Sequence, residues 1–374
     1  MKIRAAVLRE SGKARPYVNS LPLSIEEVEL DPPQRGEVLV QIKAAGLCHS
    51  DLVAINGERP KPMPIVIGHE AAGIVSDVGP GVAGVDVGDH VIPAYVASCG
   101  HCDMCREGRP ALCRPATAAN LAGTLMDGTM RLHRNGQRIH HHSGVAAFSE
   151  YAVISQNALV RIDPEISFEQ AALFGCAVLT GVGAVVNTAK VAPGQSAAIV
   201  GLGGVGLSAL LAAVASGAGQ IVAVDINEAK LKIARQLGAH ETFNANLENC
   251  VEKIRAVTHG GVHFAFETAG VPSALDLAYR VTRRGGTTVA AGMPGPDASI
   301  TLSHLSLAAE ERTIKGSYMG SCVPSRDIPR YIGLYQDHKL PIDRLTSHQI
   351  EFGELNGAFD RMADGEALRQ ILIL

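Results

Sequence analysis

Four cysteines lie close together in this sequence and have the spacing of a metal site. Cys99, Cys102, Cys105 and Cys113 fall within CGHCDMCREGRPALC, three at intervals of three residues and the fourth eight residues further on. Four thiolates can surround one zinc ion tetrahedrally and leave no coordination position for a substrate. Disulfides or a reduced surface cluster are the alternatives, but neither accounts for four thiols in so polar and turn-rich a loop. The spacing therefore predicts a structural zinc ion.

Two other segments carry residue types that bind zinc. The sequence CHSD begins at Cys48, directly after an apolar run, and the sequence GHE places His69 beside Glu70. A loop cysteine and a histidine could form half of a zinc site. Taken singly, Cys48 could equally be a small buried residue, and His69 a buried histidine with hydrogen-bond partners. A second metal site therefore depends on a third ligand.

The stretch 196–225 indicates a strand, a glycine turn, a helix and a second strand. Gly201, Gly203 and Gly206 have the GxGxxG spacing. The first glycine permits a tight turn, the second lets the backbone approach a pyrophosphate, and the third lets helix and strand pack closely. Asp225 ends the second strand, 19 residues after Gly206, where its carboxylate would accept the adenosine ribose hydroxyls and repel a 2′-phosphate. The stretch therefore predicts NAD rather than NADP.

Composition and charge exclude several other classes of protein. The 374 residues are enough for two domains with separate cores, and the formal charge of −4 without a basic run leaves no electrostatic footprint for nucleic acid. No charged side chain lies between Lys190 and Asp225, but glycine and proline interrupt this run, and buried parallel strands are also continuously apolar. The apolar run 5–8 is too short for a secretory signal. We therefore expect a cytoplasmic protein that does not contact membranes.

The elements that must position these residues follow from local pattern. Short apolar runs and many glycine and proline turns predict a β-rich body up to about Phe148, with a strong strand at 37–46. The S-x-x-Q capping box at 167–170 predicts the start of a helix that carries Cys176. After Asp225, an amphipathic helix and two further apolar strands predict a parallel, doubly wound sheet.

Taken together, these motifs resemble the zinc-dependent, medium-chain alcohol dehydrogenases, nearly from end to end. The resemblance rests on CHSD, GHE, the four-cysteine loop, the sequence FGC at 174–176, and GLGGVG followed by VDIN; the segment 123–153 resembles the liver-type and class III-like subgroup. It implies an α/β fold with two domains. A GroES-like, β-rich catalytic domain would comprise residues 1–177 and 321–374, and a Rossmann domain with a doubly wound parallel sheet would bind NAD at 178–320.

The resemblance also supplies the third zinc ligand. Cys48, His69 and Cys176 would hold a catalytic zinc ion with one position open for the alcohol oxygen. Asp51 would hold the far ring nitrogen of His69 and fix its tautomer, and Glu70 would lie close behind the metal, as a transient ligand or as a hydrogen-bonded carboxylate. The chain would then carry two zinc ions.

Cofactor and substrate contacts are likewise implied by the resemblance. The expected contacts with NAD are His49, Thr180, Gly201, Gly203, Val205, Gly206, Asp225, Lys230 and Arg369. The expected substrate-pocket residues are Tyr95, His142, Met293 and Tyr318. The histidine-rich segment 133–142 would be a loop near the substrate cleft rather than a metal site.

The expected reaction is the interconversion of an alcohol with an aldehyde or ketone by hydride transfer to or from NAD. Ser50 would take the hydroxyl proton, and Val53 stands where many resembling enzymes have a histidine, so the proton carriers would stop at Ser50 and the cofactor ribose. Glutathione-dependent formaldehyde (S-hydroxymethylglutathione) dehydrogenase is an alternative, although Thr117 stands where that subgroup carries an arginine. A non-enzymatic NAD-binding protein is a second alternative. The segment 300–317 resembles the edge through which the family forms homodimers.

Overall fold

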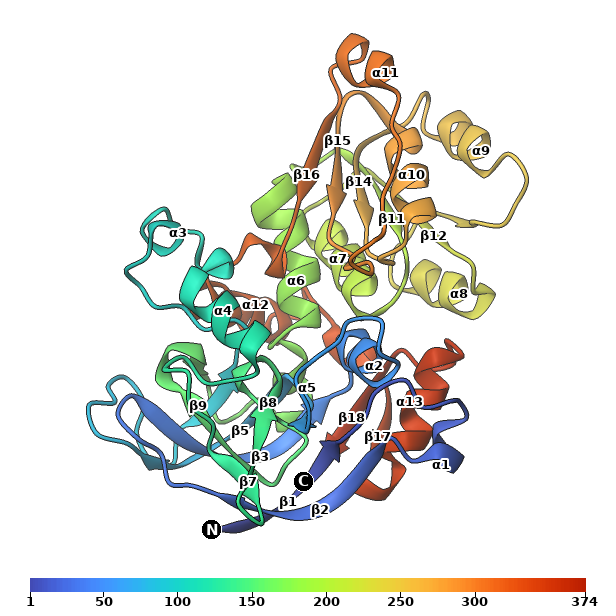
Figure 1. Ribbon diagram of the computed structural model, residues 1–374. Coiled ribbons are helices and arrows are strands. Elements are labelled where there is room, and N and C mark those ends of the chain that lie inside the picture. Colours follow the sequence, from blue (N-terminus) through green and yellow to red (C-terminus); the bar gives the residue numbers. More distant parts are fainter. The chain divides into compact units, whose positions relative to one another are not determined.

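The computed structural model describes residues 1–374 and consists of two compact units (Figure 1). The first unit comprises Met1–Cys176, Val323–Arg330 and Asp343–Leu374, and the second comprises Ala177–Cys322 and Tyr331–Ile342. The chain therefore leaves the first unit twice, after Cys176 and after Arg330, and returns to it at Val323 and at Asp343. The assignment of these units as the catalytic domain and the NAD-binding domain expected from the sequence stays a prediction.

The first unit is built mainly from β-strands in two assemblies. One is a closed barrel in the order β1-β2-β7-β8-β4, and the other is a sheet in the order β10-β6-β5-β3-β18-β17, with β9 paired to β3. The barrel strands are β1 (Lys2–Leu8), β2 (Leu23–Leu30), β4 (Ile65–Val66), β7 (Leu132–Arg134) and β8 (Gln137–His141). The sheet strands are β3 (Glu37–Gly46), β5 (Glu70–Val78), β6 (His90–Pro93), β9 (Tyr151–Ser155), β10 (Leu159–Arg161), β17 (Thr346–Ile350) and β18 (Arg369–Ile373).

Apolar alternation explains how these strands form a core. In β2, Glu26, Val28 and Leu30 are buried while Glu27 and Glu29 between them are exposed, which is the period of a strand with one face inward. The barrel strands together enclose a core of aliphatic side chains contributed by residues as distant as Ile3 and Val153. The β-rich body predicted from the sequence is confirmed.

Helices of the first unit are short and lie between the strands. They are α1 (Tyr17–Ser20), α2 (His49–Ile55), α3 (Asp103–Arg106), α4 (Arg114–Ala122), α5 (Phe168–Leu173) and α13 (Leu355–Ala363), and α12 (Pro324–Gln336) begins in this unit and continues into the second. None of the helices in the chain combines the length and the apolar character that crossing a membrane would need.

The helix expected to carry Cys176 is interrupted, so that part of the prediction is wrong. α5 ends at Leu173, and the Ser167 side chain makes no capping hydrogen bond. The backbone then turns through Phe174 and Gly175, where a Cβ on Gly175 would lie only 2.9 Å from the Pro93 carbonyl oxygen. Only glycine tolerates this close approach to β6. The chain passes Cys176 in a turn rather than on a helix.

The second unit contains one parallel sheet in the order β13-β12-β11-β14-β15-β16, with every neighbouring pair parallel. This is the doubly wound order in which the chain starts at the centre and reverses direction once. The strands are β11 (Ser196–Val200), β12 (Gln220–Asp225), β13 (Glu241–Asn244), β14 (Val262–Glu267), β15 (Thr282–Ala290) and β16 (Thr313–Gly316). The helices are α6 (Ala177–Gly183), a π-helical continuation at Ala184–Ala189, α7 (Gly204–Ala215), α8 (Glu228–Gln236), α9 (Cys250–Val257), α10 (Pro272–Val281) and α11 (His304–Ala309). The doubly wound sheet predicted from the sequence is confirmed.

Candidate active site and zinc loop

Four side chains of the first unit converge in a buried cluster, which we call the buried ligand group: Cys48, His69, Glu70 and Cys176. Their ligand atoms all lie within 4.8 Å of one another, and each residue is at most 7% exposed. Cys48 precedes α2, His69 precedes β5, and Cys176 follows the turn after α5. Three segments that are distant in the sequence therefore supply two thiols, an imidazole and a carboxylate to one point.

Asp51 organises this group from behind. Its Oδ1 lies 3.1 Å from His69 Nδ1 and accepts the Gly68 backbone N–H at 3.1 Å, and its Oδ2 accepts the Cys48 backbone N–H at 3.1 Å. Asp51 is fully buried, and burial alone would raise its pKa, but the neighbouring His69 and His142 rings hold it well below its usual range. Because Asp51 engages Nδ1, the other ring nitrogen of His69, Nε2, is the one available to a metal.

The electrostatics of the group favour the thiolate at Cys48 and the thiol at Cys176. Hydrogen bonding with Cys176 lowers the pKa of Cys48 well below its usual value, and the same interaction raises the pKa of Cys176. Burial alone would lower the pKa of His69, but the negative charges of Asp51 and Cys48 outweigh it and raise that pKa. Thiolate and imidazole gathered in a buried space are the ligands that zinc prefers.

Glu70 and Arg369 form a buried ion pair beside the ligand group. The Arg369 guanidinium donates to Glu70 Oε2, and both side chains are at most 5% exposed. Burial raises the pKa of Glu70 to about 8, against the opposing charge of Arg369. Gly46 makes the pair possible, because a Cβ at that position would lie 2.8 Å from Glu70 Oε2.

The residues present fit a zinc ion. Cys48, His69 and Cys176 form a Cys₂His set, a ligand combination that can hold a catalytic zinc ion and leave one coordination position open. Glu70 Oε1 is buried and has no hydrogen-bond partner, so a carboxylate oxygen beside the three donors has unused capacity. A cation bound here would be held by the three donors and would give Glu70 Oε1 a positively charged partner.

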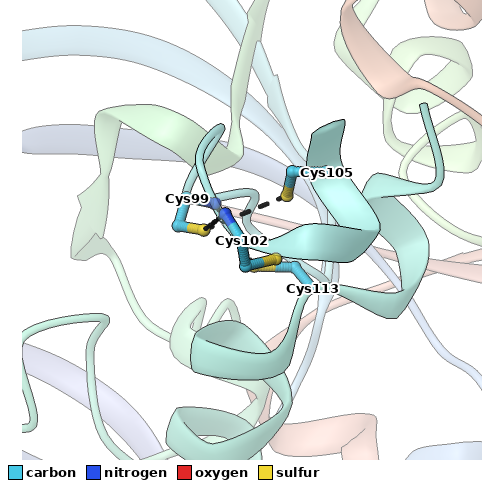
Figure 2. Close-up of side chains that lie close together, drawn as sticks. All are labelled: Cys99, Cys102, Cys105 and Cys113. Atoms are coloured by element: carbon cyan, nitrogen blue, oxygen red, sulfur yellow. Dashed lines mark hydrogen bonds between the residues drawn. The ribbon is translucent and has the colours of Figure 1, made fainter. Parts of the chain in front are cut away.

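The four cysteines of the loop predicted to bind structural zinc also converge. Figure 2 shows Cys99, Cys102, Cys105 and Cys113 pointing toward one another, and their sulfur atoms lie within 4.8 Å of one another. Backbone N–H groups of Cys99 and Cys102 donate to the sulfurs of Cys113 and Cys99, both at 3.3 Å. Hydrogen bonding from the Cys105 backbone lowers the pKa of Cys102 to about 6, which favours its thiolate. All four thiols are free, so the set fits a tetrahedral zinc ion.

The glycine turn of the second unit has the geometry of a dinucleotide site. Gly201 has a φ of 96°, and a Cβ on it would lie 2.7 Å from the Ala269 nitrogen. A Cβ on Gly206 would collide with the Gly201 carbonyl oxygen and lie 2.7 Å from Thr268 Oγ1, whereas a Cβ on Gly203 would meet nothing within 4 Å. The backbone at Gly203 and the N-terminus of α7 therefore face open space, where N–H groups can bind a pyrophosphate.

Asp225 is positioned against this turn. Its Oδ2 accepts the Leu202 backbone N–H at 2.6 Å, and its Oδ1 accepts the Asn227 backbone N–H at 2.9 Å. These bonds fix the carboxylate at the end of β12, half-buried and beside the glycines. Val205 and Lys230 are half-buried in the first turns of α7 and α8, and Thr180 Oγ1 on α6 is buried without a hydrogen-bond partner. That unused hydroxyl fits a polar contact with a bound cofactor.

Two of the expected pocket residues lie against the buried ligand group. The rings of Tyr95 and His142 meet the His69 ring edge-on, with centroids 5.6 Å and 5.1 Å away. His142 Nδ1 lies 3.0 Å from Asp51 Oδ1, but it has no hydrogen bond of good geometry. Met293 and Tyr318, the other two, belong to the second unit, where Met293 is exposed and Tyr318 is half-buried.

The histidine-rich segment is a hairpin, not the expected loop. β7 and β8 pair through it, and its side chains have structural partners: His133 Nε2 lies 2.9 Å from Asp31, and His141 Nε2 accepts the Arg131 backbone N–H at 3.0 Å. The Asn135-Gly136 pair could have indicated the hairpin from the sequence, because Asn-Gly favours a tight turn, and both residues have positive φ in the structure.

The remaining expected residues lie near α2 or β18. Ser50 is half-buried and His49 exposed in the first turn of α2, and Val53 is buried further along it. Arg369, expected to contact the pyrophosphate, is paired with Glu70, although its Nε has no partner. Its role toward the cofactor stays a prediction. Sequence reasoning missed Gly46, whose lack of a side chain leaves room for Glu70 and Arg369.

Comparisons with known proteins identify the family. Residues 34–164 match the alcohol dehydrogenase GroES-like domain, and residues 204–337 match the zinc-binding dehydrogenase family. A protein named S-(hydroxymethyl)glutathione dehydrogenase from Synechocystis sp. is 39% identical over 376 residues, which covers 100% of both chains.

Solved structures agree with this assignment. An alcohol dehydrogenase zinc-binding domain protein from Burkholderia ambifaria has a TM-score of 0.94 and 36% identity, and benzyl alcohol dehydrogenase from Acinetobacter calcoaceticus has a TM-score of 0.93 and 34% identity. Each match covers 100% of this chain and 99% of the other. The chain therefore belongs to the zinc-dependent, medium-chain alcohol dehydrogenase family and is an oxidoreductase, as the sequence motifs predicted.

Proposed function

We propose that this enzyme oxidises an alcohol to an aldehyde or ketone, or catalyses the reverse reaction, with zinc at the buried ligand group and NAD at the glycine turn. The observation that carries the proposal is the buried convergence of Cys48, His69 and Cys176, with the unpartnered Glu70 oxygen beside them. A non-enzymatic NAD-binding protein would have no use for an open, thiolate-rich zinc site.

The three ligands and Asp51 prepare the site for an alcohol oxygen. When bound there, zinc supplies Lewis acidity, which can lower the pKa of bound water from 15.7 to about 7 and sets the scale for an alcohol hydroxyl. Asp51 keeps the His69 ring oriented, and the buried Arg369 balances the charge of Glu70. Four thiolates in the loop around Cys99 would hold a second, structural zinc ion that no substrate reaches.

The second unit would hold NAD. The nicotinamide of NAD accepts the hydride when the cofactor is bound. The N-terminus of α7 would bind the pyrophosphate, Asp225 would accept hydrogen bonds from the ribose hydroxyls, and Thr180 and Val205 would contact the nicotinamide. Replacing Asp225 by alanine should raise activity with NADP relative to NAD, because the carboxylate would no longer repel a 2′-phosphate; wild-type enzyme that already prefers NADP would contradict this assignment.

The hydroxyl proton would pass to Ser50 Oγ. Val53 cannot titrate, so no side chain at that position continues the path. Val53→His should increase kcat/KM for alcohol oxidation most between roughly pH 6 and 8, where a histidine acts as a base. A pH profile with the wild-type shape, in a variant that retains both zinc ions and its NAD affinity, would contradict the relay argument.

A panel of alcohols assayed by NADH absorbance, together with metal analysis, tests the proposal. We expect two zinc ions per chain and turnover of at least one alcohol. Retained NAD binding without turnover of any alcohol or aldehyde would favour the non-enzymatic alternative.

A second candidate is oxidation of S-(hydroxymethyl)glutathione, because the Synechocystis relative carries that name. Thr117 argues against it, since a threonine offers no bidentate charge partner for a glutathione carboxylate, and its hydroxyl donates to the Cys113 carbonyl at 2.9 Å. We therefore expect simple alcohols to be oxidised at least as efficiently. A kcat/KM for S-(hydroxymethyl)glutathione far above that for simple alcohols would promote this candidate.

We further propose a cytoplasmic homodimer that associates through the edge strand β16. This strand ends the parallel sheet, so its outer side has backbone groups free to pair with a second copy. Light scattering of the purified protein would test the assembly.

A further inference from the structure

A π-helical turn continues α6 in the second unit. The turn, Ala184–Ala189, follows α6 without a break. Its backbone hydrogen bonds join residues five positions apart, a widened geometry that is rare and frequently occurs at functional sites. The turn carries two polar side chains, Asn187 and Thr188, which are both half-buried. Both side chains bind one other segment of the unit, residues 317–322.

This segment lies at the carboxyl edge of the parallel sheet. It begins directly after β16, and the Ser317 backbone N–H donates to the Ala290 carbonyl, at the end of β15, at 2.8 Å. The glycine turn follows the carboxyl end of β11 and therefore lies at the same edge. Because ligands of doubly wound sheets bind outside the carboxyl ends of the strands, the 317–322 segment lies on the cofactor side of the sheet.

The backbone of the segment is strained. Met319, Gly320 and Ser321 follow one another with φ values of 49°, 63° and 51°. Residues other than glycine rarely adopt this left-handed conformation. Such strain persists only where the surrounding contacts hold it, and it is concentrated at functional sites. The contacts that hold this segment therefore indicate what it is shaped for.

Asn187 holds the middle and the end of the segment. Its Nδ2 lies 3.5 Å from the Gly320 carbonyl oxygen and 3.3 Å from Cys322 Sγ, and it donates to the Tyr331 hydroxyl oxygen at 3.2 Å. Cys322 Sγ in turn donates to the Leu179 carbonyl of α6 at 3.3 Å. Cys322 and Tyr331 are at most 2% exposed, so this set of hydrogen bonds is shielded from water.

Thr188 holds the two serines of the segment. Its Oγ1 lies 2.8 Å from Ser317 Oγ and 2.9 Å from Ser321 Oγ. Together with the contacts of Asn187, these bonds attach the segment to the π-helical turn at its start, middle and end.

The segment is packed directly against α6 at Thr180. A Cβ on Gly320 would lie 2.6 Å from the Leu179 carbonyl oxygen and 2.8 Å from the Thr180 carbonyl oxygen. Thr180 Oγ1 is the buried, unpartnered hydroxyl that we assign to the nicotinamide end of NAD. The position of this residue and that of the segment are therefore coupled.

We propose that Asn187 and Thr188 are positioning residues for the nicotinamide of NAD. By holding the 317–322 segment against α6, they fix the backbone on which Thr180 presents its hydroxyl. The inference rests on the proposed function, because it takes NAD as the ligand of the second unit, and it adds two residues that act through others. A site that is already ordered binds the nicotinamide without first fixing the segment, so loss of these contacts should appear as weaker binding of that part of the cofactor.

The test compares NADH with ADP-ribose, which lacks the nicotinamide, on the zinc-loaded enzyme. Fluorescence titration measures the Kd of NADH, and competition measures that of ADP-ribose. Thr188→Val and Asn187→Leu should each weaken NADH binding roughly three- to tenfold, the effect of one lost hydrogen bond, and ADP-ribose binding by less than about twofold. Thr188→Ser keeps the hydroxyl and should retain the wild-type ratio of the two Kd values.

Thr282→Val is the matched control. It removes a buried hydroxyl that donates to the Ala278 carbonyl at 2.8 Å, away from the 317–322 segment in the sequence, and should leave the ratio unchanged. A change of the ratio in this control would show that any lost hydrogen bond in the unit has the same effect, which would overturn the proposal.

Equal weakening of NADH and ADP-ribose binding by Thr188→Val and Asn187→Leu would also overturn it, because the two residues would then only stabilise the unit. Unchanged NADH binding in these variants, or a Thr188→Ser variant that behaves like Thr188→Val, would do the same. The binding measurements need no turnover: if no alcohol is oxidised, the proposed reaction fails, while the ratio of the two Kd values still decides whether Asn187 and Thr188 position the nicotinamide.

Discussion

The two clusters of cysteine ligands in the first unit are built in opposite ways. The four-cysteine loop takes all its ligands from 15 consecutive residues, and three of the four cysteines are partly exposed. The buried ligand group takes Cys48, His69 and Cys176 from three separate segments, and every member is buried. Asp51 and Arg369 support the buried group through side-chain contacts, whereas backbone N–H groups donate to the sulfurs of the loop.

This difference indicates what each metal would do. A local loop folds around an ion and needs little else, so a zinc ion bound there would stabilise that loop. A site assembled from distant segments is positioned by the whole unit, which allows an open coordination position to be kept in a fixed place. Four changes would test this distinction.

The largest effect should follow loss of a ligand from the buried group. Cys176→Ser should reduce kcat/KM for alcohol oxidation by roughly 10³-fold or more, because Lewis-acid stabilisation contributes several kcal/mol. Metal analysis should show about one zinc ion lost per chain, with NAD binding retained. Normal turnover by this variant would show that the catalytic assignment is wrong.

Loss of a ligand from the loop should act on stability instead. Cys105→Ser should release the loop zinc and destabilise the first unit by about 3 kcal/mol, a fall in Tm of roughly 6–12 °C for a chain this large. Turnover per remaining zinc should stay close to wild type at low temperature. Cys250→Ala, which removes a buried thiol outside both clusters, is the control and should leave the zinc content unchanged. A loss of turnover as large as that of Cys176→Ser would remove the distinction between the clusters.

Removing the support behind His69 should weaken metal binding at one cluster only. Asp51→Asn should lower the zinc affinity of the buried group by roughly 10- to 100-fold, measured by competition with a chelator, since the partner of a metal-binding histidine fixes its ring. Asp103→Asn is the matched change in the loop, where Asp103 pairs with Arg114 at 2.6 Å in an exposed position, and should have little effect. Similar losses of zinc affinity in both variants would show that Asp51 does not specifically support metal binding by the buried ligand group.

The smallest effect concerns acid stability of the framework that holds both clusters. Burial alone would raise the pKa of Glu26, but Arg9, Ser24 and Arg134 lower it to about 2. A folded-state pKa below the unfolded value of about 4.3 adds stability above that pH, and this stability is lost as the pH falls from about 4.5 through 2.

Glu26→Gln should therefore reduce the free energy of unfolding at pH 7 by on the order of 1–3 kcal/mol, and the difference from wild type should vanish near pH 2. Thermal melts across this range measure it. Glu27→Gln, which removes an exposed pair with Lys2, should change stability by less than about 0.5 kcal/mol. A constant difference between Glu26→Gln and wild type at every pH would show that packing, not charge, is lost.

Sequence patterns of a few residues were sufficient to predict the features that depend only on neighbouring residues. The four cysteines, the three glycines before α7 and the strand at 37–46 could all be predicted, because each depends on neighbours within a few residues. The S-x-x-Q pattern at 167–170 correctly predicted where a helix begins, with Ser167 as its N-cap, but the helix ends at Leu173 and does not reach Cys176. The close approach of Gly175 to Pro93 beyond that end is a long-range contact that no local rule contains.

Long-range pairings lay beyond sequence reasoning. The Glu70 and Arg369 pair joins strands that meet only through β3, and Gly46 on β3 provides the space for it. A glycine at the end of a strand ordinarily indicates a turn. The sequence therefore could not show that Gly46 is needed to leave space for this pair. The resemblance assigned Arg369 to the cofactor, but it contains no information on which carboxylate the guanidinium contacts in this chain.

The Glu70–Arg369 pair also determines how early during protein synthesis the surroundings of the buried ligand group can be completed. The two residues are 299 positions apart, so at a typical rate of 5–20 residues per second Arg369 leaves the ribosome about 15–60 s after Glu70. During that interval the four-cysteine loop, complete within 15 residues, can already take up zinc, while β18 is still missing from the sheet that supports the other ligands. We therefore expect the thiols of Cys48 and Cys176 to lack part of their protein surroundings until β18 joins the sheet, so reducing conditions during translation should increase the amount of active enzyme.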